Sequence, residues 1–92
     1  MAPKLQTNVA VLGLGYIGLP TAAVVARSGA AVLGIDIHQH VVDTVNSGGV
    51  HIEEVDLDAL VQGVVQRGLL RASTQIEPSD VFLIAVPTPF DD

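Results

Sequence analysis

A glycine-rich turn placed between an apolar run and a helix-forming segment constrains the fold of this chain more than any other feature. The run Asn8–Leu12 is short and valine-rich, and the pattern G-x-G-x-x-G follows it directly at Gly13–Gly18. A second apolar run, Ala31–Ile35, ends at Asp36. A buried strand, a glycine turn, a helix and an acidic residue after the next strand form the fingerprint of a dinucleotide-binding βαβ unit.

The rest of the chain continues this alternation of strands and helices. We expect strands at 8–12, 31–35, 70–74 and 81–86, and helices at 16–28, 38–46 and 56–67. Asp56 is the predicted N-cap of the last helix, and Gly68 is its predicted C-terminal stop. Only 3% of the residues are aromatic, so the core must be aliphatic. Short links between alternating elements predict an α/β fold, a Rossmann-type parallel sheet with flanking helices.

The spacing of the motif assigns a role to each of its residues. Gly13 allows the tight turn, Gly15 lets a pyrophosphate approach the backbone, and Gly18 lets the helix pack closely against the sheet. The backbone N–H groups of Tyr16 and Ile17 lie at the predicted helix N-terminus. There the helix dipole favours a bound phosphate. These five residues are therefore candidate cofactor-binding residues.

Asp36 is the candidate residue for selecting the cofactor. Its carboxylate would accept hydrogen bonds from the adenosine ribose and would repel a 2′-phosphate, which favours NAD over NADP. The alternative is that the glycines only form a turn and Asp36 only caps a loop, and the intact context favours cofactor binding. Thr88 lies between two prolines after the last predicted strand. From spacing alone, it either contacts a ligand or simply follows the end of the strand.

Composition excludes several other functions. The chain has no cysteine, so it forms no disulfide, zinc–thiolate site or thiol nucleophile. Its net charge of −6 opposes binding to nucleic acid or to an anionic membrane. His38 and His40 are two positions apart, and we expect them to be solvated surface residues rather than metal ligands. We expect no metal site in this chain.

The apolar stretch 9–26 superficially resembles a signal peptide or a membrane span. Three glycines and Pro20 interrupt it, and only one basic residue precedes it. A soluble α/β pattern follows. We therefore expect a cytoplasmic protein that makes no membrane contact.

Four segments together resemble one enzyme family: VAVLGLGYIGLPTAA, GIDIHQHVVDTVNSG, LLRAST and LIAVPTPF. They are similar to the start of the UDP-glucose/GDP-mannose dehydrogenase family, and most similar to the branch that acts on UDP-N-acetylmannosamine. The resemblance implies oxidation of a primary alcohol of a nucleotide sugar to a carboxylate in two NAD-dependent steps. It also implies that Tyr16 and Ile17 contact the pyrophosphate, Asp36 the ribose, and Thr88 the cofactor.

Members of that family are several times longer and use a catalytic cysteine, which these 92 residues lack. We therefore expect residues 1–92 to be the N-terminal part of one NAD-binding domain. This part is expected to be inactive alone, with the UDP-sugar bound only by a full-length enzyme. We also expect the strand at 81–86 to pair with 8–12 and to leave an apolar edge open to self-association. Two alternatives are a stand-alone NAD-binding or sensing module and another Rossmann oxidoreductase, which GLGYIGLP with VPTP disfavours.

Overall fold

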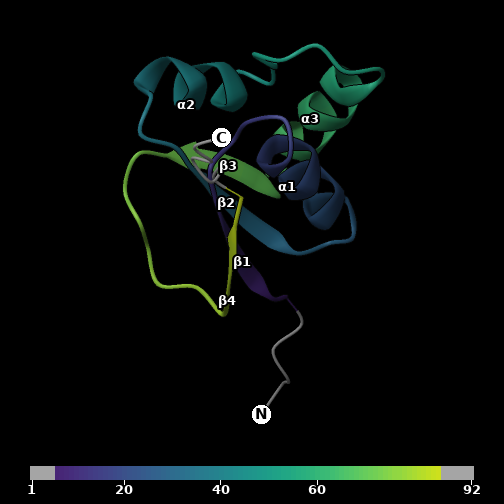
Figure 1. Ribbon diagram of the computed structural model, residues 1–92. Coiled ribbons are helices and arrows are strands. Elements are labelled where there is room, and N and C mark those ends of the chain that lie inside the picture. The colour runs from purple at the N-terminus through teal and green to yellow at the C-terminus, as the bar shows by residue number, and fades with distance from the viewer. Residues whose placement is uncertain (1–5, 86–92) are drawn as a thin grey trace, which may run out of the picture.

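The computed structural model describes residues 6–85, which form one four-stranded sheet and three helices (Figure 1). The predicted order of elements is confirmed. The strands are β1 (Asn8–Leu12), β2 (Ala31–Ile35), β3 (Leu70–Ser73) and β4 (Val81–Ile84). The helices are α1 (Gly18–Arg27), α2 (Gln39–Asn46) and α3 (Leu57–Gln66).

The sheet is parallel throughout, with the strand order β3-β2-β1-β4. Val9 of β1 pairs with Val32 of β2 on one side and with Val81 of β4 on the other. The predicted pairing of the last strand with the first is therefore confirmed as far as Ile84, whereas Val86 lies outside the described residues. Because all strands point the same way, their carboxyl ends meet at one end of the sheet. The crossover from β1 to β2 begins there.

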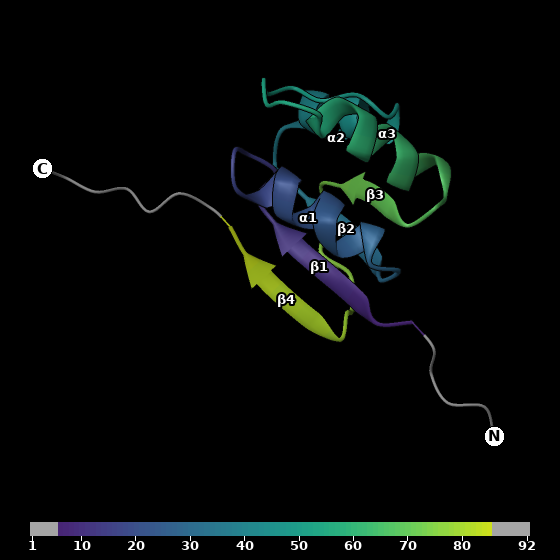
Figure 2. The ribbon, with the colours of Figure 1, turned by 90° about the vertical axis from the view of Figure 1, so that its right-hand side faces the viewer.

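All three helices cover the same face of the sheet (Figure 2). Their apolar stripes pack on Val9, Val11 and Val32, which point to this face because side chains alternate along a strand. The core is aliphatic, as predicted, since β-branched strand residues and helix faces made mainly of alanine and valine fill it. Its largest fully buried side chains are Leu14, Leu19, Leu70, Val11, Val45, Val61 and Val64.

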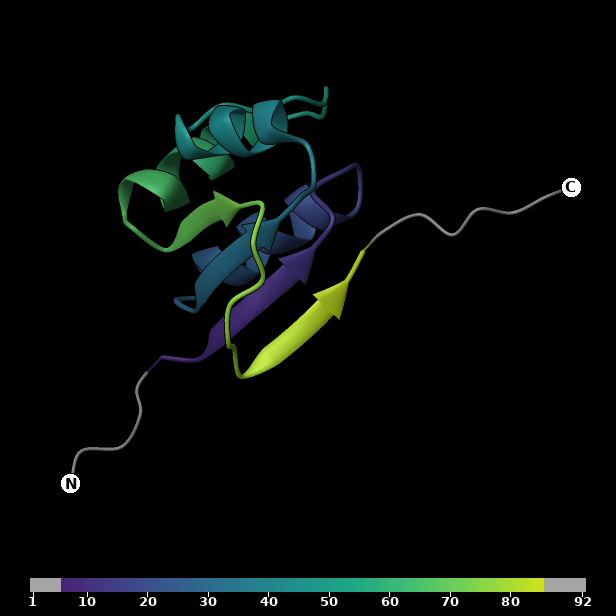
Figure 3. The same cartoon turned by 90° about the vertical axis from the view of Figure 1, so that its left-hand side faces the viewer.

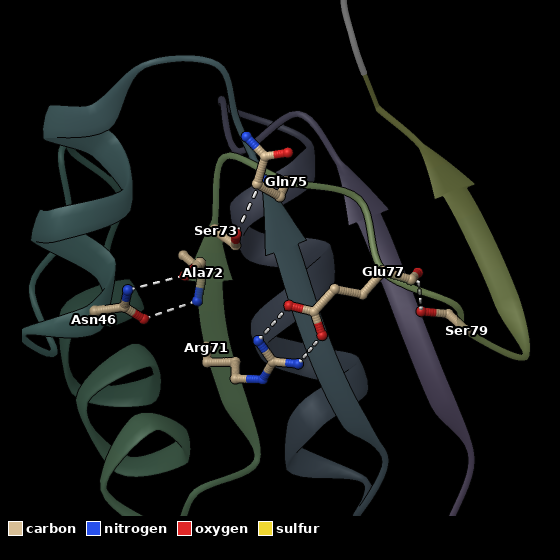
Figure 4. Close-up of polar contacts among 7 residues, drawn as sticks. All are labelled: Asn46, Arg71, Ala72, Ser73, Gln75, Glu77 and Ser79. Carbon is tan, nitrogen blue, oxygen red and sulfur yellow. Dashed lines mark hydrogen bonds and ion pairs between the residues drawn. The ribbon is translucent and has the colours of Figure 1, made fainter.

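The opposite face of the sheet carries no helix within the described part of the chain. Ala10, Leu33 and Ile35 form a small buried cluster there. The connection 74–80 crosses this face as it returns from the end of β3 to the start of β4 (Figure 3). Arg71 on β3 holds the connection through a bidentate ion pair with Glu77, with N–O distances of 2.6 and 3.1 Å (Figure 4).

Helix boundaries differ from prediction where backbone geometry overrides the sequence pattern. Helix α1 begins at Gly18 rather than Tyr16, because the preceding residues still form the turn. Asp56 directly precedes α3, but its predicted capping role is wrong. Its φ of 64° is left-handed, and its side chain makes no capping hydrogen bond. A capping residue needs extended backbone to aim its oxygen at the first turn.

The C-terminal end of α3 agrees with the prediction. Gly68, with φ of 74°, follows α3, and its N–H donates to the carbonyl of Val65. A left-handed glycine in this position satisfies the last carbonyls of a helix. Among the described residues, no helix has both the length and the hydrophobicity needed to cross a bilayer.

The side chain of Asn46 blocks the outer edge of β3. Its amide nitrogen donates to the carbonyl of Ala72 at 2.9 Å, and its amide oxygen accepts from the Ala72 N–H at 2.8 Å (Figure 4). These two bonds reproduce the pattern that a neighbouring strand would make. Within residues 6–85, β4 has no comparable neighbour on its outer side.

Candidate cofactor site

The glycine turn is held in shape by close backbone packing. Gly13 has a φ of 96°, a conformation that favours glycine, and its N–H donates to the carbonyl of Ile35 at 2.7 Å. A Cβ added to Gly18 would overlap the carbonyl oxygen of Gly13. The start of α1 can therefore pack against the end of β1 only if residue 18 has no side chain.

The middle of the turn is open. A Cβ added to Gly15 would meet nothing within 4 Å, so a ligand can approach the backbone at this point. Tyr16 and Ile17 are 72% and 71% exposed. Within residues 6–85 their backbone N–H groups have no protein acceptor. Unpaired N–H groups at the start of a helix carry partial positive charge and can bind an anion.

Leu14 ties the turn to the second strand, which the motif alone did not predict. Its side chain is fully buried and packs on Gly34, where an added Cβ would lie 2.7 Å from Leu14 Cδ2. Its N–H donates to Asp36 Oδ2 at 3.0 Å. Gly34, a glycine inside the second strand, was the sequence feature that could have indicated this packing of Leu14.

Asp36 lies at the carboxyl end of β2, and its side chain is only 14% exposed. Its Oδ1 accepts from the backbone N–H of His38 at 3.0 Å and contacts His38 Nδ1 at 2.8 Å. Burial acts to raise the pKa of this carboxyl. The hydrogen bonds from His38 and Leu14 outweigh it, so the pKa lies below its ordinary value. Asp36 is therefore an oriented carboxylate at neutral pH.

A cleft of about 750 Å³ opens at the carboxyl ends of β1 and β2, where ligands of open α/β sheets bind. Of the predicted site residues, Gly13, Gly15 and Asp36 line it, whereas Tyr16, Ile17 and Gly18 lie beside it in the turn. Thr88 lies outside the described residues. The lining that the sequence did not predict includes Leu14, Ile37, His38, His40, Val41, His51, Thr74, Ile76 and Ala85.

The histidines are arranged differently from the prediction in one respect. His38 and His40 are exposed, as expected, and no group of three metal-ligating side chains occurs in residues 6–85. Their rings nevertheless lie edge to face with centroids 5.9 Å apart, and His38 contacts Asp36. His38 precedes α2 rather than lying inside it, so helical spacing did not apply.

A parallel sheet of this strand order, with a glycine turn and an aspartate at its carboxyl ends, defines a Rossmann-type dinucleotide-binding domain. The model of the UDP-glucose/GDP-mannose dehydrogenase family, NAD binding domain, matches residues 7–92. The chain belongs to this family, and its cofactor is NAD. The resemblance found in the sequence is confirmed.

Curated relatives and solved structures agree with this assignment. The chain is 61% identical over 85 residues to an NDP-N-acetyl-D-galactosaminuronic acid dehydrogenase of Ralstonia nicotianae, covering 92% of this chain and 20% of the relative. It is 56% identical over 83 residues to the UDP-N-acetyl-D-mannosamine dehydrogenase of Escherichia coli, covering 90% of this chain and 20% of the relative.

The solved UDP-N-acetyl-mannosamine dehydrogenase of Staphylococcus aureus superposes with a TM-score of 0.90 at 48% identity, over 94% of this chain and 21% of that one. The GDP-mannose dehydrogenase of Pseudomonas aeruginosa, solved as a ternary complex, gives a TM-score of 0.86 at 34% identity. This match covers 90% of this chain and 20% of that one. The chain thus spans about a fifth of the length of the relatives it matches.

Proposed function

We propose that the turn Gly13–Gly18 and Asp36 together hold NAD, with the pyrophosphate on the N–H groups of Tyr16 and Ile17. The observation that carries this proposal is the cleft itself. It joins the open backbone at Gly15 to an ionised carboxylate at Asp36. Thr88 would add a contact from the segment after β4, as the family resemblance implies.

Preference for NAD over NADP follows from charge. A 2′-phosphate would meet the Asp36 carboxylate, and neither arginine nor lysine lines the cleft within the described residues. Calorimetric titration of the chain should therefore show binding of NAD and much weaker binding of NADP.

Substitution of Asp36 tests this assignment directly. Asp36→Ala should weaken NAD binding by about 1–3 kcal/mol, the range for a lost charged hydrogen-bond partner. Asp58→Ala, on the exposed first turn of α3, removes the same charge away from the cleft and should leave NAD affinity unchanged. Equal affinities for wild type and Asp36→Ala would remove Asp36 from the site.

The reaction we propose is the NAD-dependent oxidation of a nucleotide-linked N-acetylhexosamine to its uronate, with UDP-N-acetylmannosamine as the substrate. Two relatives support this class, because their names contain N-acetyl-D-galactosaminuronic acid and N-acetyl-D-mannosamine. The 92 residues contain no cysteine to serve as the family's nucleophile, so this chain alone would supply cofactor binding without chemistry. NADH formation from UDP-N-acetylmannosamine by the purified chain would contradict the proposal that this chain alone has no catalytic activity.

The proposed reaction belongs in the cytoplasm, where NAD is available.

The outer side of β4 is the proposed site of self-association. Val81, Phe82 and Ile84 are 42%, 47% and 74% exposed, and no described strand pairs with β4 on that side. Unpaired apolar strands favour pairing with another chain. Light scattering after size-exclusion chromatography should show a mass above that of the monomer, and Ile84→Lys should reduce it. A monomer at high concentration would refute this proposal.

A further inference from the structure

The contact between His38 and Asp36 has no part in the function proposed above. We propose that His38 is a positioning residue: its imidazole orients the Asp36 carboxylate toward the adenosine ribose and so strengthens the preference for NAD over NADP. This inference rests on the proposed function, because it requires Asp36 to bind the ribose.

The backbone at His38 places its ring for this contact. His38 is the residue before α2, with extended dihedrals of φ −91° and ψ 111°, the usual conformation of a helix-capping residue. Its side chain makes no capping hydrogen bond. The ring instead lies back toward the strand end, where Nδ1 is 2.8 Å from Asp36 Oδ1. The side chain best placed to cap α2 is thus committed to the carboxylate.

The direction of this hydrogen bond follows from the charge of Asp36. Three hydrogen bonds hold the pKa of that carboxyl below its ordinary value despite burial, so it is ionised and can only accept. His38 Nδ1 must therefore carry the hydrogen that is donated.

Counting acceptor sites shows why the ring affects the ribose. A carboxylate offers roughly four lone-pair sites. Oδ1 receives the backbone N–H and the ring of His38, and Oδ2 receives the N–H of Leu14. About one site, on Oδ2, is left for a ribose hydroxyl. Without the ring, a second site on Oδ1 is free, and the carboxylate plane is fixed by two backbone donors alone.

Two substitutions at His38 separate the donor from the rest of the ring. Asn places its Nδ2 the same number of bonds from Cα as His Nδ1, so His38→Asn keeps a donor, whereas His38→Leu removes it. We expect His38→Leu to weaken NAD binding about three- to tenfold with NADP binding unchanged, since NADP gains nothing from an oriented carboxylate. The Kd ratio of NADP to NAD should fall by the same factor. His38→Asn should stay within about twofold of wild type.

The residue after His38 provides a control outside the cleft. Gln39 is exposed, does not line the cleft and bonds to Asp43 rather than to Asp36, so Gln39→Leu should keep the wild-type Kd ratio. If His38→Leu also keeps the wild-type Kd ratio of NADP to NAD, the positioning role is overturned. The same holds if His38→Asn and His38→Leu lower that ratio equally. Asp36→Ala separates the two hypotheses. If Asp36→Ala loses the preference for NAD over NADP while His38→Leu keeps it, only the role of His38 is refuted.

A second measurement does not depend on cofactor binding. Titration of the Asp36 carboxyl by NMR should show a higher pKa in His38→Leu than in wild type, because one hydrogen bond to the charged form is lost. His38→Asn should restore the lower pKa. An Asp36 pKa that is the same in all three proteins would overturn the inference. Binding of neither cofactor at millimolar concentration would overturn the proposed function and the inference together.

Discussion

The two faces of the sheet share the same strands but are stabilised by different means. On the helix-covered face, fully buried side chains such as Leu19 and Val61 pack with no exposed surface. On the other face, a small apolar cluster lies beneath a connection that is held mainly by polar contacts, among them the Arg71–Glu77 pair. Most of the buried apolar side chains among the described residues therefore lie on the helix-covered face.

The turn that joins β1 to the covered face should be the most sensitive to substitution. Gly18→Ala should lower the free energy of unfolding by about 3 kcal/mol, because its methyl group would overlap the Gly13 carbonyl and neither backbone segment can move freely. Urea denaturation followed by circular dichroism measures this.

Gly15→Ala is the matched control in the same turn. Its methyl group enters open space at a φ that is not left-handed, so stability should change by less than about 1 kcal/mol. NAD binding should nevertheless weaken by about 1.5–3 kcal/mol, as expected if the pyrophosphate loses a hydrogen bond from the backbone. Equal stability of the two variants would contradict the packing argument.

Truncating one aliphatic side chain on each face should have unequal effects. Leu19→Ala should destabilise the chain by about 3 kcal/mol, since it empties a fully buried site between α1 and the sheet. Ile84→Ala, at a side chain that is 74% exposed on β4, should cost less than about 0.5 kcal/mol. Thermal denaturation of both variants checks the contrast, and similar costs would show that the second face is also a folding core.

The edge of β3 depends on the side chain of Asn46. Asn46→Ala removes two hydrogen bonds to the backbone of Ala72 and should cost about 1 kcal/mol. Amide hydrogen exchange at Ala72 should accelerate more than exchange at Val32 in the neighbouring strand. Gln39→Ala, which removes only a surface contact to Asp43, should change neither measurement.

The smallest effect is expected from the ion pair over the open face. The hydrogen bonds from Arg71 hold the pKa of Glu77 below its ordinary value. The stabilisation is therefore present above the unfolded-state pKa of about 4.3 and is lost as pH falls through the lower folded-state value. Glu77→Gln should lower the Tm slightly at pH 7 and low salt, and high salt should reduce the difference. A salt-independent difference would rule out an electrostatic origin.

Local sequence chemistry was sufficient to predict the covered face. The strands at Asn8–Leu12 and Ala31–Ile35 were predicted to the residue, because valine and isoleucine runs bounded by glycine or aspartate leave little choice. The apolar spacing from Leu57 to Val64 identified the buried face of α3 for the same reason. Glycines that need positive φ, such as Gly68, marked the helix ends correctly.

Individual long-range side-chain contacts and the backbone conformation of single loop residues could not be predicted. The partner of Asn46 is 26 positions away along the chain, and nothing local indicates it. Helical spacing predicts that His38 lies within α2, whereas it lies just before the helix, so the sequence pattern does not indicate its contact with Asp36. The capping role predicted for Asp56 is wrong because Asp56 itself has a left-handed backbone conformation, which composition does not reveal.

Asn46 also limits how copies of this chain could assemble. A sheet with two open edges can add copies without end, whereas here the amide of Asn46 occupies the edge at β3. Two copies joined through their β4 strands about a twofold axis would each present a blocked edge to the outside. Assembly would then stop at a closed pair, because an isologous contact uses the same surface on both partners. If copies pair through β4 as proposed, one side chain on α2 would favour a finite dimer over a fibre.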